Sequence, residues 1–164
     1  MLPQLKSTST YFLNWNLERI GRCLDELTED QVWQRPNVSS NSVGNQVLHL
    51  CGNISQWILT GLGEAPDIRQ RDEEFATLGG YSKEVLLARL TEVITKSIAV
   101  INGLKEEEMI RVRPVQAYEH DGVFIIMHVV EHLSYHTGQI IFWTKALKNI
   151  DLDFYAGDDL NTTT

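Results

Sequence analysis

Apolar residues recur at three- and four-residue intervals in four long stretches of the chain, a spacing typical of amphipathic α-helices. The pattern predicts helices at about residues 9–27, 42–62, 82–104 and 122–148. Asn41 or Ser42, Ser82 and Asp121 stand where helix N-caps are expected, because their short polar side chains can accept from free backbone N–H groups. The pattern therefore predicts an all-α protein.

The connections between the predicted helices constrain its topology. Residues 63–81 form a polar connection that is too long for a tight antiparallel hairpin, so it can carry the chain along a bundle and leave the second and third helices parallel. In residues 105–120 we interpret the run Glu106-Glu-Glu as a solvated helix end, and Arg111-Val-Arg-Pro-Val as a turn or short extended piece. No linker or repeat interrupts the chain, so we expect a single domain over residues 1–164.

The composition of the chain argues against some classes of binding partner. The chain has 164 residues, 43% of them hydrophobic, and a net charge of -8 without any block of Lys and Arg, which argues against nucleic acid and anionic membranes as partners. No apolar run approaches the length of a membrane span, and the first residues do not resemble a signal peptide. We therefore expect a soluble, cytoplasmic protein. Cys23 and Cys51, each within a predicted helix, are interpreted as small buried hydrophobes and not as a disulfide pair.

Three histidines, His128, His132 and His136, follow one another at four-residue intervals in the fourth predicted helix. Adjacent members share a helix face, but His128 and His136 are about 12 Å apart along the axis, too far to bind one ion. One adjacent pair can therefore bind a metal. Catalytic metal sites usually have three protein ligands, and His49, at the edge of the apolar stripe of the second helix, is the natural third.

The surroundings of these histidines suggest a pocket or, alternatively, a buried polar network of His, Asn and Gln side chains. Asn45, Asn53 and Gln56 lie within about 40° of His49 around the second helix. On the fourth helix, Gln139 shares the inward stripe of His132. Other apolar positions of that helix point elsewhere, and we expect a second, partner-facing surface there; its members are Ile126 and Ile141.

The segment His128-Val-Val-Glu131-His132 also matches the H-x-x-E-H signature of inverted zinc proteases. Those enzymes take a third ligand from a glutamate well downstream, whereas this chain has no Glu after His132 and is much smaller. We therefore reject the protease interpretation. Glu131 lies about 100° from His132 around the helix and is expected to have a structural or supporting role.

Two segments together resemble a known family: Asn41-Ser-Val-Gly-Asn-Gln-Val-Leu-His49-Leu and His132-Leu-Ser-Tyr-His136-Thr-Gly-Gln139-Ile. Their order and the length of the chain are similar to those of the DinB-like (YfiT-like) superfamily of metal-dependent enzymes. The resemblance implies a four-helix bundle in up-down-down-up order. It also implies a divalent metal, commonly zinc or nickel, held by His49, His132 and His136, with His128 as a pocket or supporting residue.

The resemblance leaves two functions open. One is a metal-dependent hydrolase or low-molecular-weight-thiol S-transferase that acts on a small molecule, with Asn45, Gln56 or Gln139 orienting the substrate. We identify no carboxylate base near the site, which favours water or a thiol activated by the metal. The other is a non-catalytic metal-binding bundle with a structural or interaction role. In either case we expect a homodimer.

Overall fold

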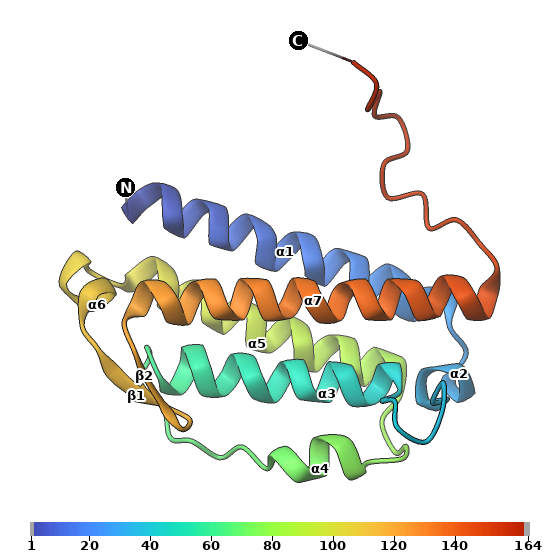
Figure 1. The fold of residues 1–164 in the computed structure, drawn as a ribbon, viewed down its shortest axis with the longest axis horizontal. Coiled ribbons are helices and arrows are strands. Elements are labelled where there is room, and N and C mark those ends of the chain that lie inside the picture. The colour runs from blue at the N-terminus through green and yellow to red at the C-terminus, as the bar shows by residue number, and fades with distance from the viewer. Residues whose placement is uncertain (1, 163–164) are drawn as a thin grey trace.

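The computed structural model describes residues 2–162 and shows a bundle of four long helices (Figure 1). Helices α1 and α7 run in one direction, and α3 and α5 run in the opposite direction, which confirms the expected up-down-down-up topology. The π-helical segment η1 directly continues α3. The bounds are α1 (Leu2–Glu26), α3 (Val43–Ile54), η1 (Ser55–Thr60), α5 (Lys83–Gly103) and α7 (Gly122–Lys148).

The helix starts follow from local capping. The Ser42 side chain accepts from the backbone N–H of Asn45, and the Asn45 side chain reciprocally accepts from the N–H of Ser42, which completes a capping box. The side chains of Ser82 and Asp121 accept in the same way at α5 and α7. The predicted caps are therefore confirmed. Only the start of the first helix was misplaced, because α1 begins at Leu2 and not near Ser9.

The connections contain more structure than periodicity predicted. Short helices α2 (Glu29–Trp33) and α4 (Arg71–Ala76) form in the connections before α3 and α5. The acidic run predicted as a solvated helix end begins a separate helix, α6 (Glu106–Ile110), where negative charge favours the N-terminal turn. A small antiparallel hairpin follows, formed by β1 (Arg113–Val115) and β2 (Tyr118–His120).

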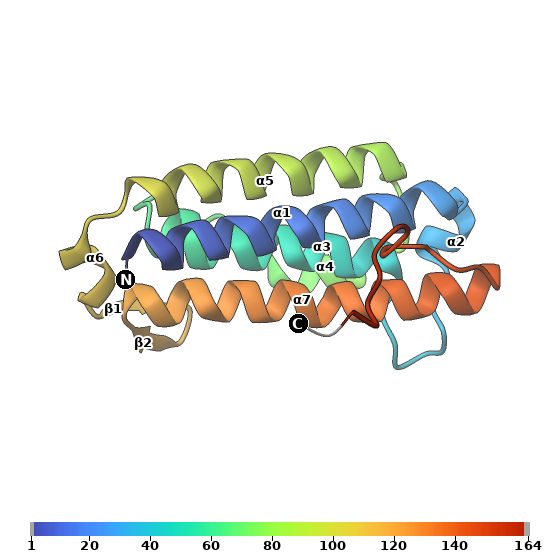
Figure 2. The ribbon, with the colours of Figure 1, turned by 90° about the horizontal axis from the view of Figure 1, so that it is seen from above.

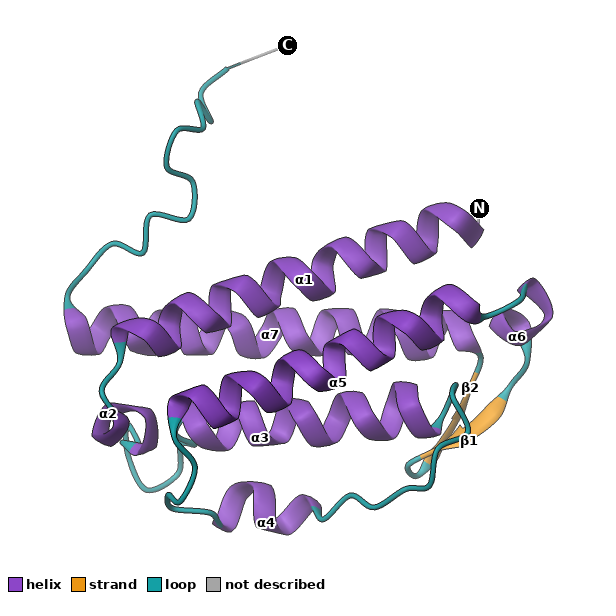
Figure 3. Ribbon diagram, turned by 180° about the vertical axis from the view of Figure 1, so that it is seen from behind, coloured by secondary structure: helices purple, strands orange, loops and turns teal. Residues whose placement is uncertain are grey.

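The four long helices enclose one apolar core. Helix α1 contacts α5 and α7, and α3 contacts the same two helices, so α1 and α3 lie diagonally across the bundle (Figure 2). Helix α4 packs against the outer side of α3, away from α1 (Figure 3). The core contains side chains from every long helix, including Leu13, Ile20, Val47, Leu50, Leu90, Ile94, Ile125, Leu133 and Ile140.

Two predictions about individual side chains have different outcomes. Both cysteines are free, and burial raises the pKa of Cys23 to about 11 and that of Cys51 to about 12, so both thiols are protonated near neutral pH. The predicted partner-facing surface of the fourth helix is wrong, because Ile126 is fully buried in the core and Ile141 packs against it. Among residues 2–162, no helix has the length and apolar character that a membrane crossing requires.

Candidate metal centre

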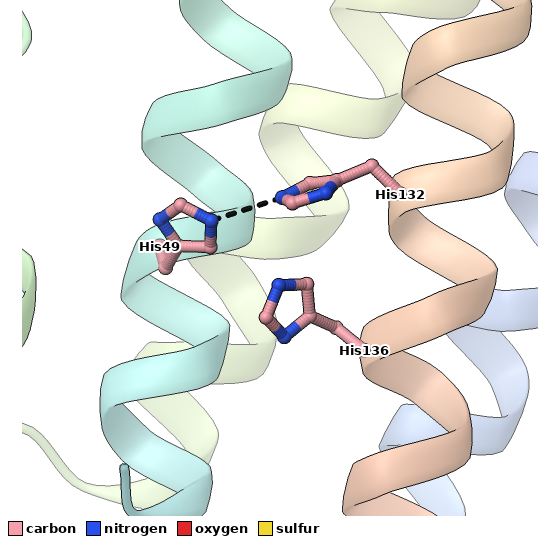
Figure 4. A group of neighbouring side chains, drawn as sticks. All are labelled: His49, His132 and His136. Atoms are coloured by element: carbon pink, nitrogen blue, oxygen red, sulfur yellow. Dashed lines mark hydrogen bonds between the residues drawn. The ribbon is translucent and has the colours of Figure 1, made fainter. Parts of the chain in front are cut away.

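Three histidines from two helices meet between α3 and α7 (Figure 4). Each of His49, His132 and His136 offers a ring nitrogen, and these nitrogens all lie within 4.8 Å of one another. Nε2 of His49 and Nε2 of His132 lie 2.9 Å apart. The structure thus brings together the three side chains that the family resemblance grouped as ligands.

The donor set fits a metal ion. Around a tetrahedral zinc with nitrogen ligands at about 2.0–2.1 Å, neighbouring ligand atoms are about 3.3 Å apart. The observed separations, from 2.9 Å up to a limit of 4.8 Å, bracket this spacing. Imidazole suits zinc, nickel and iron. The cluster can therefore hold a metal ion with little movement of the side chains.

The surroundings of His132 and His136 favour the neutral form of both imidazoles. Burial, together with the neighbouring His136 and His49, lowers the pKa of His132 to about 3. Burial and the neighbouring His49 lower the pKa of His136 to about 4. Near pH 7 both rings are therefore neutral, and each keeps one nitrogen lone pair, as metal binding requires.

A carboxylate supports His49 on the side away from the cluster. Oε2 of Glu74 lies 3.0 Å from Nδ1 of His49, and Arg69 donates to both carboxylate oxygens, at 2.7 and 2.8 Å. These bonds, together with the placement of Glu74 on α4, hold the carboxylate behind the ring. The sequence interpretation identified no carboxylate base near the site, and it did not identify Glu74 as a support of His49. Glu74 belongs to the long connection, where no periodic pattern indicates which helix the segment packs against.

An amide supports His136. Oε1 of Gln46, on α3, lies 3.1 Å from Nδ1 of His136. Sequence reasoning also missed this residue, although a signal existed: Gln46 precedes His49 by three positions, so both side chains lie on neighbouring parts of one helix face. Helix α3 therefore supplies one histidine of the cluster and orients another.

Two of the predicted pocket residues, Asn45 and Gln56, help to hold Glu74 behind His49. Asn45 is buried and donates to the backbone carbonyls of Glu74 and Thr77, at 3.0 and 2.7 Å, which fastens α4 to α3. Gln56 accepts from Nη1 of Arg69 at 2.9 Å. Their contacts therefore hold the segment that carries Glu74, and a role in orienting a substrate stays a prediction.

The other two predicted residues lie on α7, on either side of the histidine pair. Gln139 is half-buried, one turn after His136. His128 stacks toward His132 with ring centroids 5.5 Å apart and packs on Trp57 at 3.8 Å. Its Nε2 is buried and has no hydrogen-bond partner within residues 2–162. His128 is thus adjacent to the cluster but does not belong to it.

The cluster is partly accessible to solvent. His49 is only 7% exposed, whereas His132 is partly exposed. A separate cavity of about 660 Å³ lies between η1, α4 and α5, and its wall includes Gln56, Arg69 and Glu74 but none of the three histidines. The three histidines therefore do not form the wall of this cavity.

Comparisons with known proteins agree with this architecture. The chain is similar to a solved conserved protein from Enterococcus faecalis, with 16% identity, a TM-score of 0.73, and coverage of 88% of this chain and 97% of that chain. A DinB-like protein from Bacillus cereus (16% identity, TM-score 0.65, 82% and 87% covered) and one from Bacillus subtilis (13%, 0.66, 88% and 94%) are also similar. No curated protein sequence matches the chain.

These identities are low, so the solved structures establish the fold alone; they confirm the DinB-like bundle expected from the sequence. A family model, described as "Protein of unknown function (DUF1572)", matches residues 5–156. This match covers nearly the whole chain. The chain therefore belongs to the DUF1572 family, and its fold is the DinB-like four-helix bundle.

Proposed function

We propose that this protein is a metal-dependent enzyme, a hydrolase or a low-molecular-weight-thiol S-transferase, that acts on a small molecule with zinc or nickel held by His49, His132 and His136. One observation carries the proposal: three ring nitrogens from two helices converge at a place that is not fully closed, since His132 is partly exposed. Catalytic metal sites use three protein ligands and leave a position for water or substrate, whereas structural sites are closed by four.

Bound at this place, a divalent ion would lower the pKa of a coordinated water or thiol toward neutrality. The chain itself would keep the imidazoles of His132 and His136 neutral and would orient those of His49 and His136. Phe75 on α4 packs against His49, with their ring centroids 4.9 Å apart. His128 and Gln139 flank the histidine pair on α7, and we propose that they contact the substrate.

For the thiol-transferase function, the properties of the two cysteines indicate that the reacting thiol belongs to a separate molecule. Burial raises the pKa of Cys51 to about 12 and that of Cys23 to about 11, which makes both thiols poor nucleophiles near neutral pH. A transferred thiol would therefore come from a co-substrate, a free low-molecular-weight thiol.

The first test is elemental analysis of untagged protein purified without chelator. The expected result is about one zinc or nickel per chain in the wild type and none in His49→Ala. His120→Ala is the matched control, since His120 belongs to β2 and lies outside the cluster. Protein that contains the metal is then assayed for hydrolysis and for thiol transfer. A wild type that binds neither metal, even after reconstitution, would overturn the proposal.

A non-catalytic, dimeric metal-binding bundle is the second candidate, and exposed aromatic residues favour it. Tyr135 and Phe142 are 60% and 73% exposed, and their seven-residue spacing places them on one side of α7. A second copy of the chain could cover them. Sedimentation of the wild type and of Phe142→Ser tests this association: a dimer that the substitution dissociates supports it, and a monomeric wild type contradicts it.

A further inference from the structure

We infer that Glu74, held by Arg69, is a positioning residue that keeps His49 in the tautomer with the proton on Nδ1, so that the lone pair of Nε2 faces His132 and His136. The inference rests on the proposed metal-dependent function, which it deepens by naming the groups that prepare one ligand. It also makes a claim about His49 that can be tested without any metal.

The contacts form a short chain of charged groups. Nδ1 of His49 lies 3.0 Å from Oε2 of Glu74, and Nε of Arg69 donates to the other carboxylate oxygen at 2.7 Å. The side chains of Arg69 and Glu74 are only 4% and 9% exposed. Because the pair is buried and mutually neutralised, the carboxylate stays ionised and acts as a hydrogen-bond acceptor for the ring.

Two tautomers compete at His49. Nη2 of Arg69 lies 3.2 Å from Nδ1 and could donate to an unprotonated Nδ1, which would leave the proton on Nε2 and weaken metal binding there. In that arrangement, however, the lone pairs of Nδ1 and Oε2 would face each other at 3.0 Å. The carboxylate contact is also the shorter of the two. The geometry therefore favours donation from Nδ1 to Glu74, and Arg69 stabilises the carboxylate.

The fold makes room for this carboxylate. An added Cβ at Gly52, one turn after His49 on α3, would lie 1.9 Å from Oε1 of Glu74. Any larger residue at position 52 would have to displace the carboxylate. Asn45, one turn before His49, fastens the backbone of Glu74 and Thr77 to α3. The carboxylate is thus placed behind the ring by contacts on both sides of His49.

The contribution of such a carboxylate to metal affinity is known from other metal sites. A carboxylate that accepts from the far nitrogen of a metal-binding histidine fixes the ring and makes it more basic, and its loss typically lowers metal affinity about 10–100-fold. We expect an effect of this size for Glu74→Ala.

The experiment compares the wild type with Glu74→Ala, Gly52→Ala and Asp72→Ala, all stripped of metal. Two-bond ¹⁵N–¹H spectra of the histidine rings, with His49 assigned from the His49→Ala variant, report which nitrogen carries the proton. Zn²⁺ affinity is then measured by competition with a chromophoric chelator. Gly52→Ala keeps every polar group and displaces the carboxylate, so it tests the same point if Glu74→Ala does not fold. Asp72, exposed on the same short helix, is the charge-matched control.

The expected result is a proton on Nδ1 of His49 in the wild type and in Asp72→Ala, and on Nε2 in Glu74→Ala and Gly52→Ala, with Zn²⁺ affinity about 10–100-fold lower in these two. A wild type with the proton on Nε2, or variants with unchanged tautomer and affinity, would overturn the inference. A wild type that binds no Zn²⁺ would instead overturn the proposed function, and the spectra would still decide whether Glu74 controls the tautomer.

Discussion

Gln46 on α3 accepts a hydrogen bond from the ring of His136 on α7, with 3.1 Å between Oε1 and Nδ1. Because an amide oxygen can only accept, the proton of the neutral ring lies on Nδ1, and the Nε2 lone pair is left for the cluster. This contact joins two residues that lie 90 positions apart in the sequence. It gives His136 the kind of support that Glu74 gives His49, but from an uncharged group.

Replacement of Gln46 by Leu is expected to lower metal affinity about 10-fold, near the lower end of the range for lost hydrogen bonds behind metal ligands. Leu removes the acceptor at a site that is only 5% exposed and leaves Nδ1 of His136 unpaired. Chelator competition with Zn²⁺ measures the change. Gln139→Leu is the control, and equal affinities of the two variants would contradict the role of Gln46.

The metal-free protein is expected to lose stability as the pH falls below about 6.5. In the folded chain, burial holds the pKa of His132 at about 3 and that of His136 at about 4, against an ordinary value of 6.5. In this window the unfolded chain binds more protons, so the free energy of unfolding decreases as the pH falls. Above about pH 6.5 both rings are neutral in both states, and this contribution no longer changes.

Urea unfolding of metal-free protein at a series of pH values between about 7.5 and 5 measures this dependence, in a range above the titration of ordinary carboxylates. His132→Gln is the matched variant, because it removes one of the two rings and keeps a polar side chain. Its dependence on pH should be shallower than that of the wild type. Identical slopes would show that His132 does not carry the effect.

Replacement of His128 by Phe is expected to leave metal content unchanged and to keep or raise the melting temperature. Phe preserves the packing on Trp57 and removes the buried Nε2, which has no partner within residues 2–162. A buried polar atom without a partner costs free energy, so its removal should not destabilise the fold. Metal analysis and thermal unfolding check both points, with His132→Phe as the variant that should lose the metal.

Two glycine substitutions should have opposite effects on stability. At Gly138, in α7, nothing lies within 4 Å of an added Cβ, so Gly138→Ala should stabilise the protein by about 1 kcal/mol through helix propensity. At Gly44, in α3, a Cβ would lie 2.8 Å from the ring of Trp33, so Gly44→Ala should destabilise it by about 1–3 kcal/mol. Urea unfolding of both variants measures these differences, and effects of the same sign would contradict the packing described.

The four long helices and their caps were predictable because both depend on neighbours close in sequence. A helix places residues three and four apart on one face, and the caps at Ser42, Ser82 and Asp121 bond groups within three residues. The same periodicity singled out pairs of histidines on the fourth helix. The two segments that resemble the DinB-like superfamily then gave the topology and grouped His49 with His132 and His136.

The support of the histidines depended on tertiary structure. Arg69 and Glu74 lie in the connection after η1, where no hydrophobic period indicates which face a side chain takes. Glu74 reaches His49 only because α4 docks on α3, where Asn45 fastens its backbone and Gly52 leaves space for its carboxylate. The sequence by itself determined the helices and the histidines they carry, since these follow from local spacing. Only the tertiary structure decided which groups orient the rings: the packing of the connection against α3 brings Glu74 to His49, and the packing of α3 against α7 brings Gln46 to His136. These contacts join segments with no regular spacing between them.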